Sequence, residues 1–329
     1  MPYLLGLVLA SFVITSIFMV PFIDLLFFLK RKLKRQISRK SSSQTPIHDQ
    51  LMKDDEKIPS GAGALLIVIL VVLSIVAAPL TNSLKILLFT LVSFGVLGFV
   101  DDFKLMLTRR KGKFFGLDRG KILIWQSVMA ILIATMLYVM IGMNNLYIAY
   151  LGNFVIGYWY IPLAAFVIVS FANAYNISDG LDGLAAGLLL ICLFAFLGIA
   201  SISLDLSLAS FIGIWIGALF AFLYFNIWPA RIFLGDSGAF AFGATLAVVG
   251  LLTGKILALA IIGGMFVVIV ASSLLQIMAK VINKKILPVT PIHMYFRYIG
   301  WEEPKIVVRF WLAQGLLAIF GLWIALLSR

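Results

Sequence analysis

Apolar runs of about 20 residues recur along the whole length of this chain, and they constrain its fold more than any other feature. An α-helix needs a run of that length to cross the hydrocarbon core of a bilayer. Of the 329 residues, 63% are hydrophobic and the mean hydropathy is +1.11, whereas a soluble domain is about half apolar. We therefore predict an all-α polytopic membrane protein in which residues 1–329 form one integral membrane domain.

About ten transmembrane helices are predicted from these runs. The first run has no basic segment before it and is longer than the apolar region of a signal peptide, so we expect it to be retained. An even number of crossings places the N- and C-termini on the same side of the membrane. The predicted spans cover residues 4–29, 59–80, 84–100, 121–142, 158–175, 184–203, 207–226, 238–254, 256–281 and 306–328.

Lysine and arginine are divided unequally between the two sides that these spans define. Twenty-three of the 26 Lys and Arg residues lie in or beside one set of connections, which leaves Lys85, Lys255 and Arg329 for the other. Cytoplasmic loops carry such an excess, so the basic set is predicted to be cytoplasmic and both termini to lie outside. Basic membrane loops account for the net charge of +12 without a nucleic acid partner, and they can also attract anionic lipid or phosphorylated substrates.

Five aspartates mark the predicted cytoplasmic ends of spans. A carboxylate in hydrocarbon costs roughly 2.5–3.5 kcal/mol or more, so several at one face indicate a shared polar site. The loop acids Asp54, Asp55 and Glu56 are interpreted as solvated, and Asp24, inside the first span, is expected to have a buried structural partner. An active site at the cytoplasmic face is expected around the aspartates that have glycine nearby in apolar sequence, namely Asp101, Asp102, Asp179, Asp182 and Asp236.

The stretch NAYNISDGLDGLAAG, residues 173–187, places an amide or a carboxylate at every third position. On one continuous helix this spacing drifts by about 60° per step, which would turn the last group away from the first. The glycines instead predict a span that ends near Asn176, a tight turn, and a new helix that begins near Leu184. Asp179 and Asp182 would then lie near a helix N-terminus that binds an anion through a bridging cation. The alternative is a capped loop between two spans.

Two further motifs place acids beside glycine at the ends of spans. In GFVDDFK, residues 98–104, Asp101 and Asp102 would point about 100° apart on a helix. We therefore expect different roles, a base or ligand for one and support for the other. In GDSG, residues 235–238, Asp236 lies between small residues that let a ligand approach the backbone. This setting suits Mg²⁺, which keeps most of its waters and binds substrate phosphate oxygens.

The segment PVTPIHMYFRYIGWEEPKIVVRFW, residues 288–311, forms the last connection. Its prolines interrupt any helix that enters from the ninth predicted span. Its cationic side chains could close over a diphosphate. The alternative is a basic cytoplasmic loop with interfacial aromatic residues.

Together and in this order, the four segments resemble the polyprenyl-phosphate N-acetylhexosamine-1-phosphate transferases, which are ten-span enzymes with cytoplasmic active sites. The last segment, and KIPSGAGALLIV at residues 57–68, are most similar to the subgroup that transfers phospho-N-acetylmuramoyl-pentapeptide in peptidoglycan synthesis. The resemblance implies Mg²⁺ as cofactor, a UDP-linked amino sugar as donor, polyprenyl (undecaprenyl) phosphate as acceptor, and release of UMP. It also implies a multi-pass protein of the plasma membrane surrounded by lipid, and it is compatible with a homodimer.

The resemblance assigns roles only where the motifs match. Asp101 and Asp102 match the family's aspartate pair, and Asp236 matches its magnesium-ligating aspartate. Asp182 matches an aspartate associated with uracil recognition, and Phe233 a phenylalanine that stacks on uracil. The other matching residues are expected to bind substrate, and they are Lys57, Lys121, Asn173, Asn176, Asp179, Asn226 and His293. Among them, Lys57 and Lys121 match lysines that line the cleft.

Two departures from the family leave the donor open. Leu105 stands where the family has a lysine. Where the subgroup has three histidines and then a glutamate, this chain has His293, Met294, Tyr295 and Arg297, so two histidines and an acid are missing. UDP-N-acetylglucosamine, or another UDP sugar for a different cell-surface glycan, is therefore the alternative donor. A transporter or lipid-binding protein with a vestigial site is the alternative of another class. A transporter would place ionisable residues near the membrane midplane rather than at one face.

Overall fold

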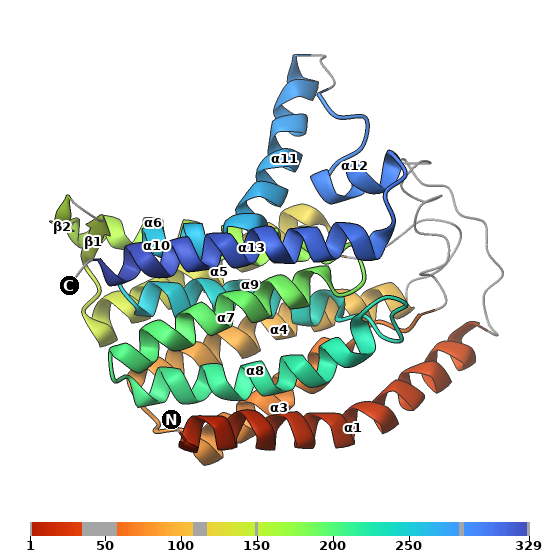
Figure 1. Ribbon diagram of the computed structural model, residues 1–329, viewed down its shortest axis with the longest axis horizontal. Helices are drawn as coiled ribbons and strands as arrows, with labels where there is room; N and C mark the ends of the chain where they lie inside the picture. Colours follow the sequence, from red (N-terminus) through yellow and green to blue (C-terminus); the bar gives the residue numbers. More distant parts are fainter. Residues whose placement is uncertain (1, 35–57, 108–116, 149–150, 283–285, 328–329) are drawn as a thin grey trace.

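The protein is a bundle of long apolar helices in the computed structural model (Figure 1). A bilayer core offers no hydrogen-bonding partner to the backbone, so apolar runs of this length close their hydrogen bonds within helices. The structure describes residues 2–34, 58–107, 117–148, 151–282 and 286–327. The elements in these ranges are α1 (Pro2–Lys34), α3 (Ala62–Ala77), α4 (Asn82–Leu107), α5 (Arg119–Met136), η2 (Leu137–Ile141), β1 (Asn145–Ile148), β2 (Gly152–Val155), η3 (Gly157–Trp159), α6 (Tyr160–Ser178), α7 (Leu184–Ile202), α8 (Leu206–Asn226), α9 (Gly235–Leu252), α10 (Ile256–Ile262), α11 (Gly264–Val281), α12 (Ile292–Tyr298) and α13 (Glu303–Leu326).

The prediction of an all-α polytopic membrane protein is confirmed. Within the described ranges, eight helices are long and apolar enough to cross a membrane, or nine if the bent pair α10 and α11 is counted as one span. The helix α3 coincides with the remaining predicted span, but its 16 residues fall short of the roughly 20 that a perpendicular crossing needs. The number ten and the orientation of the bundle therefore stay predictions.

The hairpin of β1 and β2 is a short departure from helix in the described part of the chain. The two strands pair antiparallel, with Asn145 opposite Val155 and Ile148 opposite Gly152. The hairpin occupies the connection between the fourth and fifth predicted spans. It lies at the same end of the bundle as the beginning of α1 and the end of α13 (Figure 1). That end is opposite the one at which the site described below is found.

The break between α10 and α11 corrects one predicted span. Residues 256–281 were expected to cross as one unit, but the two helices meet at 79° and α11 leaves the bundle (Figure 1). The bend frees backbone groups that need partners inside the protein. Gln314 of α13 supplies them, because its amide nitrogen donates to the carbonyl of Ile262 and its oxygen accepts from the N–H of Met265 at 3.1 Å. The thiol of Cys192 donates to the same carbonyl at 3.2 Å.

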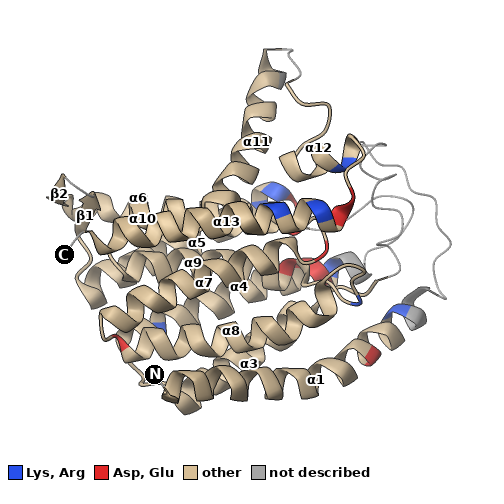
Figure 2. Cartoon of the chain, viewed as in Figure 1, with Lys and Arg blue, Asp and Glu red and all other residues tan. Residues whose placement is uncertain are grey.

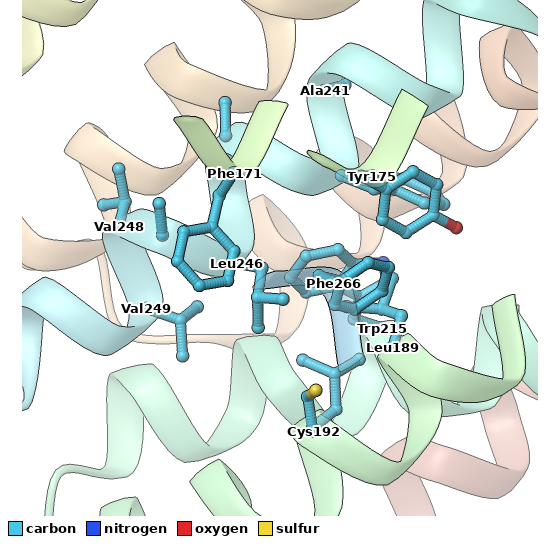
Figure 3. Close-up of a cluster of buried hydrophobic side chains, with 14 of the residues drawn as sticks. Phe171, Tyr175, Leu189, Cys192, Trp215, Ala241, Leu246, Val248, Val249 and Phe266 are labelled. Carbon is cyan, nitrogen blue, oxygen red and sulfur yellow. The ribbon is translucent and has the colours of Figure 1, made fainter. Parts of the chain in front are cut away.

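Aromatic side chains fill the centre of the bundle (Figure 3). Tyr175 of α6 stacks on Phe266 of α11 with ring centroids 5.4 Å apart, and Trp215 of α8 meets Phe242 of α9 edge to face at 5.3 Å. Each ring removes a large apolar area from its surroundings and fixes the neighbouring helices in orientation. The helix α9 packs against α3, α4 and α6, so its first turn, which carries Asp236, is held from several sides.

Candidate active site

Charged side chains gather at one end of the helix bundle (Figure 2). The acids on α4 and α9 lie there together with the turn between α6 and α7 and the beginning of α13. These elements are far apart in the sequence, so the fold itself brings the motifs together. A transporter would place such a group near the middle of the helices. The described residues show no group of charged side chains there (Figure 2).

Asp102 binds the first turn of α9 through both carboxylate oxygens. Its Oδ1 accepts from the backbone N–H of Asp236 at 3.1 Å, and its Oδ2 accepts from the N–H of Ser237 at 3.0 Å. A carboxylate here accepts hydrogen bonds from two backbone N–H groups that have no partner within the helix. Its negative charge also interacts favourably with the positive end of the helix dipole. Asp102 therefore joins the end of α4 to the beginning of α9 and supports Asp236.

Asp101 has different hydrogen-bond partners from its neighbour. One of its oxygens accepts a hydrogen bond from the backbone N–H of Leu117, just before α5. The residue as a whole is only 6% exposed. The carboxylate of Asp236 interacts electrostatically with both Asp101 and Asp102. Three acidic side chains thus lie close together, and a cation would reduce their mutual repulsion.

Asn176 links the α6 motif to this acidic group. Its amide nitrogen donates to Oδ1 of Asp236 at 2.8 Å. The hydrogen bond fixes one carboxylate oxygen and orients the other, in the way that hydrogen-bonded neighbours orient metal-ligating carboxylates. The motifs around residues 98–104, 173–187 and 235–238 therefore converge at Asp236.

Glycines allow the helices of the site to approach closely. A Cβ atom added at Gly98 would collide with the backbone of Asp236, and one added at Gly63 would collide with the backbone of Gly238. Gly235 has a positive φ of 82°, and a side chain there would meet Asp102 Oδ2 at 2.9 Å. The glycines of GFVDDFK and GDSG thus set the separation between α4 and α9.

The turn between α6 and α7 follows the prediction closely, since α6 ends at Ser178 and α7 begins at Leu184. Within it, Asp182 is buried and its Oδ2 accepts from the N–H of Ala230 at 2.8 Å. Asn226 is also buried. It accepts from Gly183 N–H at 3.2 Å and donates to the carbonyl of Ile232 at 3.0 Å. Asp182 and Asn226 therefore hold the turn against the segment that leads into α9.

The basic last connection closes onto the same turn. The carboxylate of Glu303 accepts from the backbone N–H of Asp182 at 2.7 Å, and its other oxygen forms an ion pair with Arg297 at 3.2 Å. His293 is buried, and its imidazole lies so close to Gly180 that a Cβ added there would meet Nε2 at 2.9 Å. The helices α12 and α13 are thereby attached to the glycine turn.

Burial and mutual repulsion perturb the two acids of this turn. Burial, aided by the charges of Asp182 and Asp102, raises the pKa of Asp179 to about 7. Burial also raises the pKa of Asp182, while the Ala230 N–H and Arg297 act in the opposite direction. A nearby cation would stabilise the charged form of both carboxyl groups. Carboxyl groups whose pKa is shifted in this way are typical of functional sites.

Three expected site residues are not linked to the acids by a hydrogen bond within the described residues, and a fourth lies outside those residues. Asn173 donates to Gln126 of α5 at 2.7 Å and to its own helix, so it joins α6 to α5. Phe233 is half-buried and its backbone pairs with that of Ser60. Lys121 is exposed near the start of α5, and Lys57 lies outside the described residues.

The site also contains residues that the sequence analysis did not single out. Glu303 was part of a quoted motif but was given no role, although an acid in the first turn of a helix that follows a basic loop is a recognisable signal. Arg297 was noted only as a departure from the family. Leu117 contributes a backbone N–H, which carries no signal in the side-chain sequence.

A divalent metal fits the acids that are present. Among the described residues, no group of three or more His, Cys, Asp or Glu side chains forms a complete metal site. Mg²⁺ does not need one, because it is bound by one or two carboxylates together with substrate phosphates and water. Asp236, oriented by Asn176 and close to Asp101, suits such a site, whereas both oxygens of Asp102 already accept from the backbone.

Comparisons with known proteins identify the family of this chain. The family model for glycosyl transferase family 4 matches residues 84–254. The phospho-N-acetylmuramoyl-pentapeptide-transferase of Desulforapulum autotrophicum is 33% identical, over 82% of this chain and 80% of that protein. The proteins of the same name from Pelobacter propionicus and Bacillus subtilis are 34% and 33% identical, over 80% and 81% of this chain and 78% and 83% of theirs. The chain therefore belongs to glycosyl transferase family 4 and is an integral membrane protein.

Proposed function

We propose that this protein transfers phospho-N-acetylmuramoyl-pentapeptide from a UDP donor to polyprenyl phosphate, releasing UMP and forming a lipid-linked diphosphate sugar. Relatives with this activity in their names cover about four-fifths of the chain. The observation that carries the proposal is the convergence of Asp102 and Asn176 on the α9 turn that bears Asp236. That convergence places acids and a helix N-terminus where a diphosphate and its metal ion could bind.

Asp236 is proposed as the metal ligand, with Asp101 beside it. Bound Mg²⁺ would neutralise the donor diphosphate and polarise the phosphorus under attack. Asn176 keeps the Asp236 carboxylate oriented, and Asp102 keeps the helix turn in place. These contacts support pre-organisation of the charged groups, which lowers the barrier without reorganisation during the reaction.

Asp101 is proposed to orient the acceptor phosphate or to accept its proton. A phosphate monoester has a second pKa near 6, so it is mostly dianionic at neutral pH. A strong base is then unnecessary, and positioning and charge neutralisation contribute more than proton abstraction. One carboxylate oxygen of Asp101 accepts a hydrogen bond from the N–H of Leu117, which is consistent with this role.

The glycine turn is proposed to bind the donor nucleotide. Asp182 and Asn226 fix this turn against the segment before α9, and Phe233 lies at the end of the same segment. The family resemblance assigns uracil recognition to Asp182 and uracil stacking to Phe233. Lys57, Lys121, Asn173, Asp179 and His293 are proposed as further substrate-binding residues.

The location is proposed to be the plasma membrane, with the site on the cytoplasmic face. The support is the distribution of Lys and Arg, which favours the end of the bundle that carries the acids. A UDP sugar is made inside the cell, so this orientation gives the donor access to the site. The acceptor is proposed to reach the site from the surrounding lipid, and a homodimer is compatible with the chain.

UDP-N-acetylglucosamine remains the second candidate donor, because Met294, Tyr295 and Arg297 replace residues typical of the muramoyl subgroup. Purified protein in detergent, supplied with undecaprenyl phosphate and Mg²⁺, should release UMP with UDP-N-acetylmuramoyl-pentapeptide. A parallel reaction uses UDP-N-acetylglucosamine. Release with the simpler sugar alone would replace the proposed donor with the second candidate. Silence with both donors would contradict the proposed activity.

A further inference from the structure

Asp24 of α1 is one of the acids that the proposed function does not use. The expectation of a buried structural partner for it is wrong. Its side chain is exposed, and it forms neither a hydrogen bond nor an ion pair in the part of the chain that the structure describes. An exposed carboxylate in an apolar helix at the edge of a bilayer is costly. Such a residue is therefore a candidate for binding a ligand that carries a positive charge.

Asp24 lines a cavity of about 380 Å³ between α1 and the end of α8. Pro21 lies within α1, where the missing N–H and the ring of proline kink a helix, and α1 changes direction along its length (Figure 1). Beyond the cavity, the ammonium of Lys30 donates to the carbonyl of Ile58. The cavity is thus bounded by the kinked helix α1 and by the hydrogen bond that joins Lys30, near the end of α1, to Ile58. Its lining residues are Val20, Ile23, Asp24, Phe27, Ile58, Phe225, Ala230 and Arg231.

The cavity combines apolar walls with one acid and one base. Val20, Ile23 and Phe27 of α1 face it, and Arg231 is the residue of opposite charge to Asp24. Arg231 is exposed, and its backbone N–H is bonded to the carbonyl of Phe225 at 2.8 Å, which anchors the residue at the cavity wall. A matching ligand therefore has an apolar part, an anionic group for Arg231 and a cationic group for Asp24.

We propose that this cavity binds the headgroup of a phospholipid that carries a primary amine. Arg231 would bind the phosphate and Asp24 the ammonium, while the aliphatic and aromatic walls would cover the glycerol and the first methylenes of the chains. Polyprenyl phosphate has the anionic group and the apolar tail but no cation, so it leaves Asp24 without a partner. The charges therefore favour an aminophospholipid over the acceptor substrate.

The cavity is separate from the candidate active site but shares a wall with it. Ala230 lines the cavity, and its N–H donates to Asp182 on the other side of the chain at 2.8 Å. A lipid bound in the cavity would thus contact the segment that holds Asp182. The proposal does not depend on the transfer activity, and its test needs no substrate.

Native mass spectrometry of the purified full-length protein tests the proposal. The protein in detergent is titrated with phosphatidylethanolamine, phosphatidylcholine and phosphatidylglycerol, one at a time. Phosphatidylethanolamine should be retained roughly tenfold more strongly than phosphatidylglycerol, since its ammonium donates charge-assisted hydrogen bonds to Asp24, whereas the glycerol headgroup offers only neutral hydroxyl donors. Phosphatidylcholine should lie between them, because its quaternary amine is charged but has no N–H.

Two charge variants separate the two ends of the headgroup. Asp24→Asn should reduce the retention of phosphatidylethanolamine to that of phosphatidylglycerol. Arg231→Gln should weaken both by a similar factor. Glu302→Gln and Arg309→Gln are the matched controls, because both residues are exposed and lie outside the cavity, and they should leave the preference unchanged. Val20→Trp adds volume at an exposed position of the cavity wall and should weaken all three lipids without changing a charge.

Several outcomes would overturn the proposal. Equal retention of the three lipids by the wild-type protein would remove the basis for a headgroup site. A preference for phosphatidylethanolamine that survives Asp24→Asn would place its ammonium elsewhere. One-for-one displacement of phosphatidylethanolamine by undecaprenyl phosphate, unaffected by Asp24→Asn, would assign the cavity to the acceptor.

Discussion

Two interruptions of apolar helix in this bundle both have side-chain partners for their backbone groups, but only the first carries acids. At the turn between α6 and α7, Asp179 and Asp182 lie at the end of the bundle, beside the other acids. At the break between α10 and α11, the freed carbonyl of Ile262 and the N–H of Met265 are both bonded to Gln314. A membrane protein can leave regular helix only where backbone groups find partners. The first interruption therefore carries acids of the candidate site, and the second changes the direction of the chain.

Asp236→Asn should give the largest effect and separates activity from stability. Asparagine keeps an oxygen for the amide of Asn176 but removes the charge that would bind the metal. We expect transfer to fall by at least roughly 100-fold, measured as UMP release, with an unchanged thermal unfolding midpoint. Glu302→Gln, an exposed acid at the same end of the bundle, is the control. Substantial residual activity in Asp236→Asn would contradict the metal assignment.

Gln314→Leu should have the opposite signature. It leaves the N–H of Met265 without its side-chain partner and the carbonyl of Ile262 with only the weak thiol donor of Cys192, which costs roughly 1–3 kcal/mol. We expect a lower unfolding midpoint and little change in the KM for either substrate in the fraction that remains folded. Cys192→Ala removes only a weak donor to the same carbonyl and should be milder. A stable Gln314→Leu protein with a raised donor KM would erase the distinction between the two interruptions.

Glu303→Gln tests whether the last connection positions the glycine turn. The variant weakens both the bond to the Asp182 N–H and the ion pair with Arg297. We expect the KM for the UDP donor to rise several-fold to roughly tenfold, with the KM for polyprenyl phosphate unchanged.

The double variant Arg297→Glu with Glu303→Arg sharpens this test. It restores an ion pair of reversed polarity but offers no acceptor to the Asp182 N–H. Stability should therefore recover while the donor KM stays high. Recovery of both would mean that the ion pair alone matters.

The pH dependence of stability should show the smallest effect. Asp179 has a pKa of about 7 in the folded protein against 3.8 as its ordinary value, so the folded state binds this proton more tightly. Its contribution to stability is complete below about pH 4 and is lost as the pH rises through about 7. Because the side chain is partly exposed, solvent screening reduces the effect. The unfolding midpoint should fall less between pH 5 and pH 8 in Asp179→Asn than in the wild type, and equal slopes would contradict this.

The sequence was sufficient to predict most of the fold, because each membrane crossing is encoded by its own apolar run. The turn at residues 178–184 was also predicted, since glycine and aspartate carry a local signal. The break between α10 and α11 was not predicted. Glycine is common in membrane helices, and the partner that makes the break possible, Gln314, lies about 50 positions further along the chain.

The candidate site was predicted in its members more than in its contacts. Asp101, Asp102 and Asp236 were recognised as acids beside glycine. That Asp102 bonds to the N-terminus of α9, and that Asn173 points to Gln126 instead of the acids, depends on how the helices pack. Neither a backbone N–H such as that of Leu117 nor the orientation of a helical side chain toward one neighbour or another is encoded in a single-sequence motif.

The glycines between α3, α4 and α9 have a consequence for how this protein can vary. Gly63 packs directly against the backbone of Gly238, and Gly98 against that of Asp236. The absence of a side chain at these two positions therefore sets how closely the helices approach. Gly98 lies on α4 together with Asp101 and Asp102. Even an alanine at Gly98 would therefore push the first turn of α9, with Asp236, away from these two acids. Activity can therefore be lost through a substitution that changes no charged residue. The positions that tolerate substitution least are these glycines, which carry no functional group.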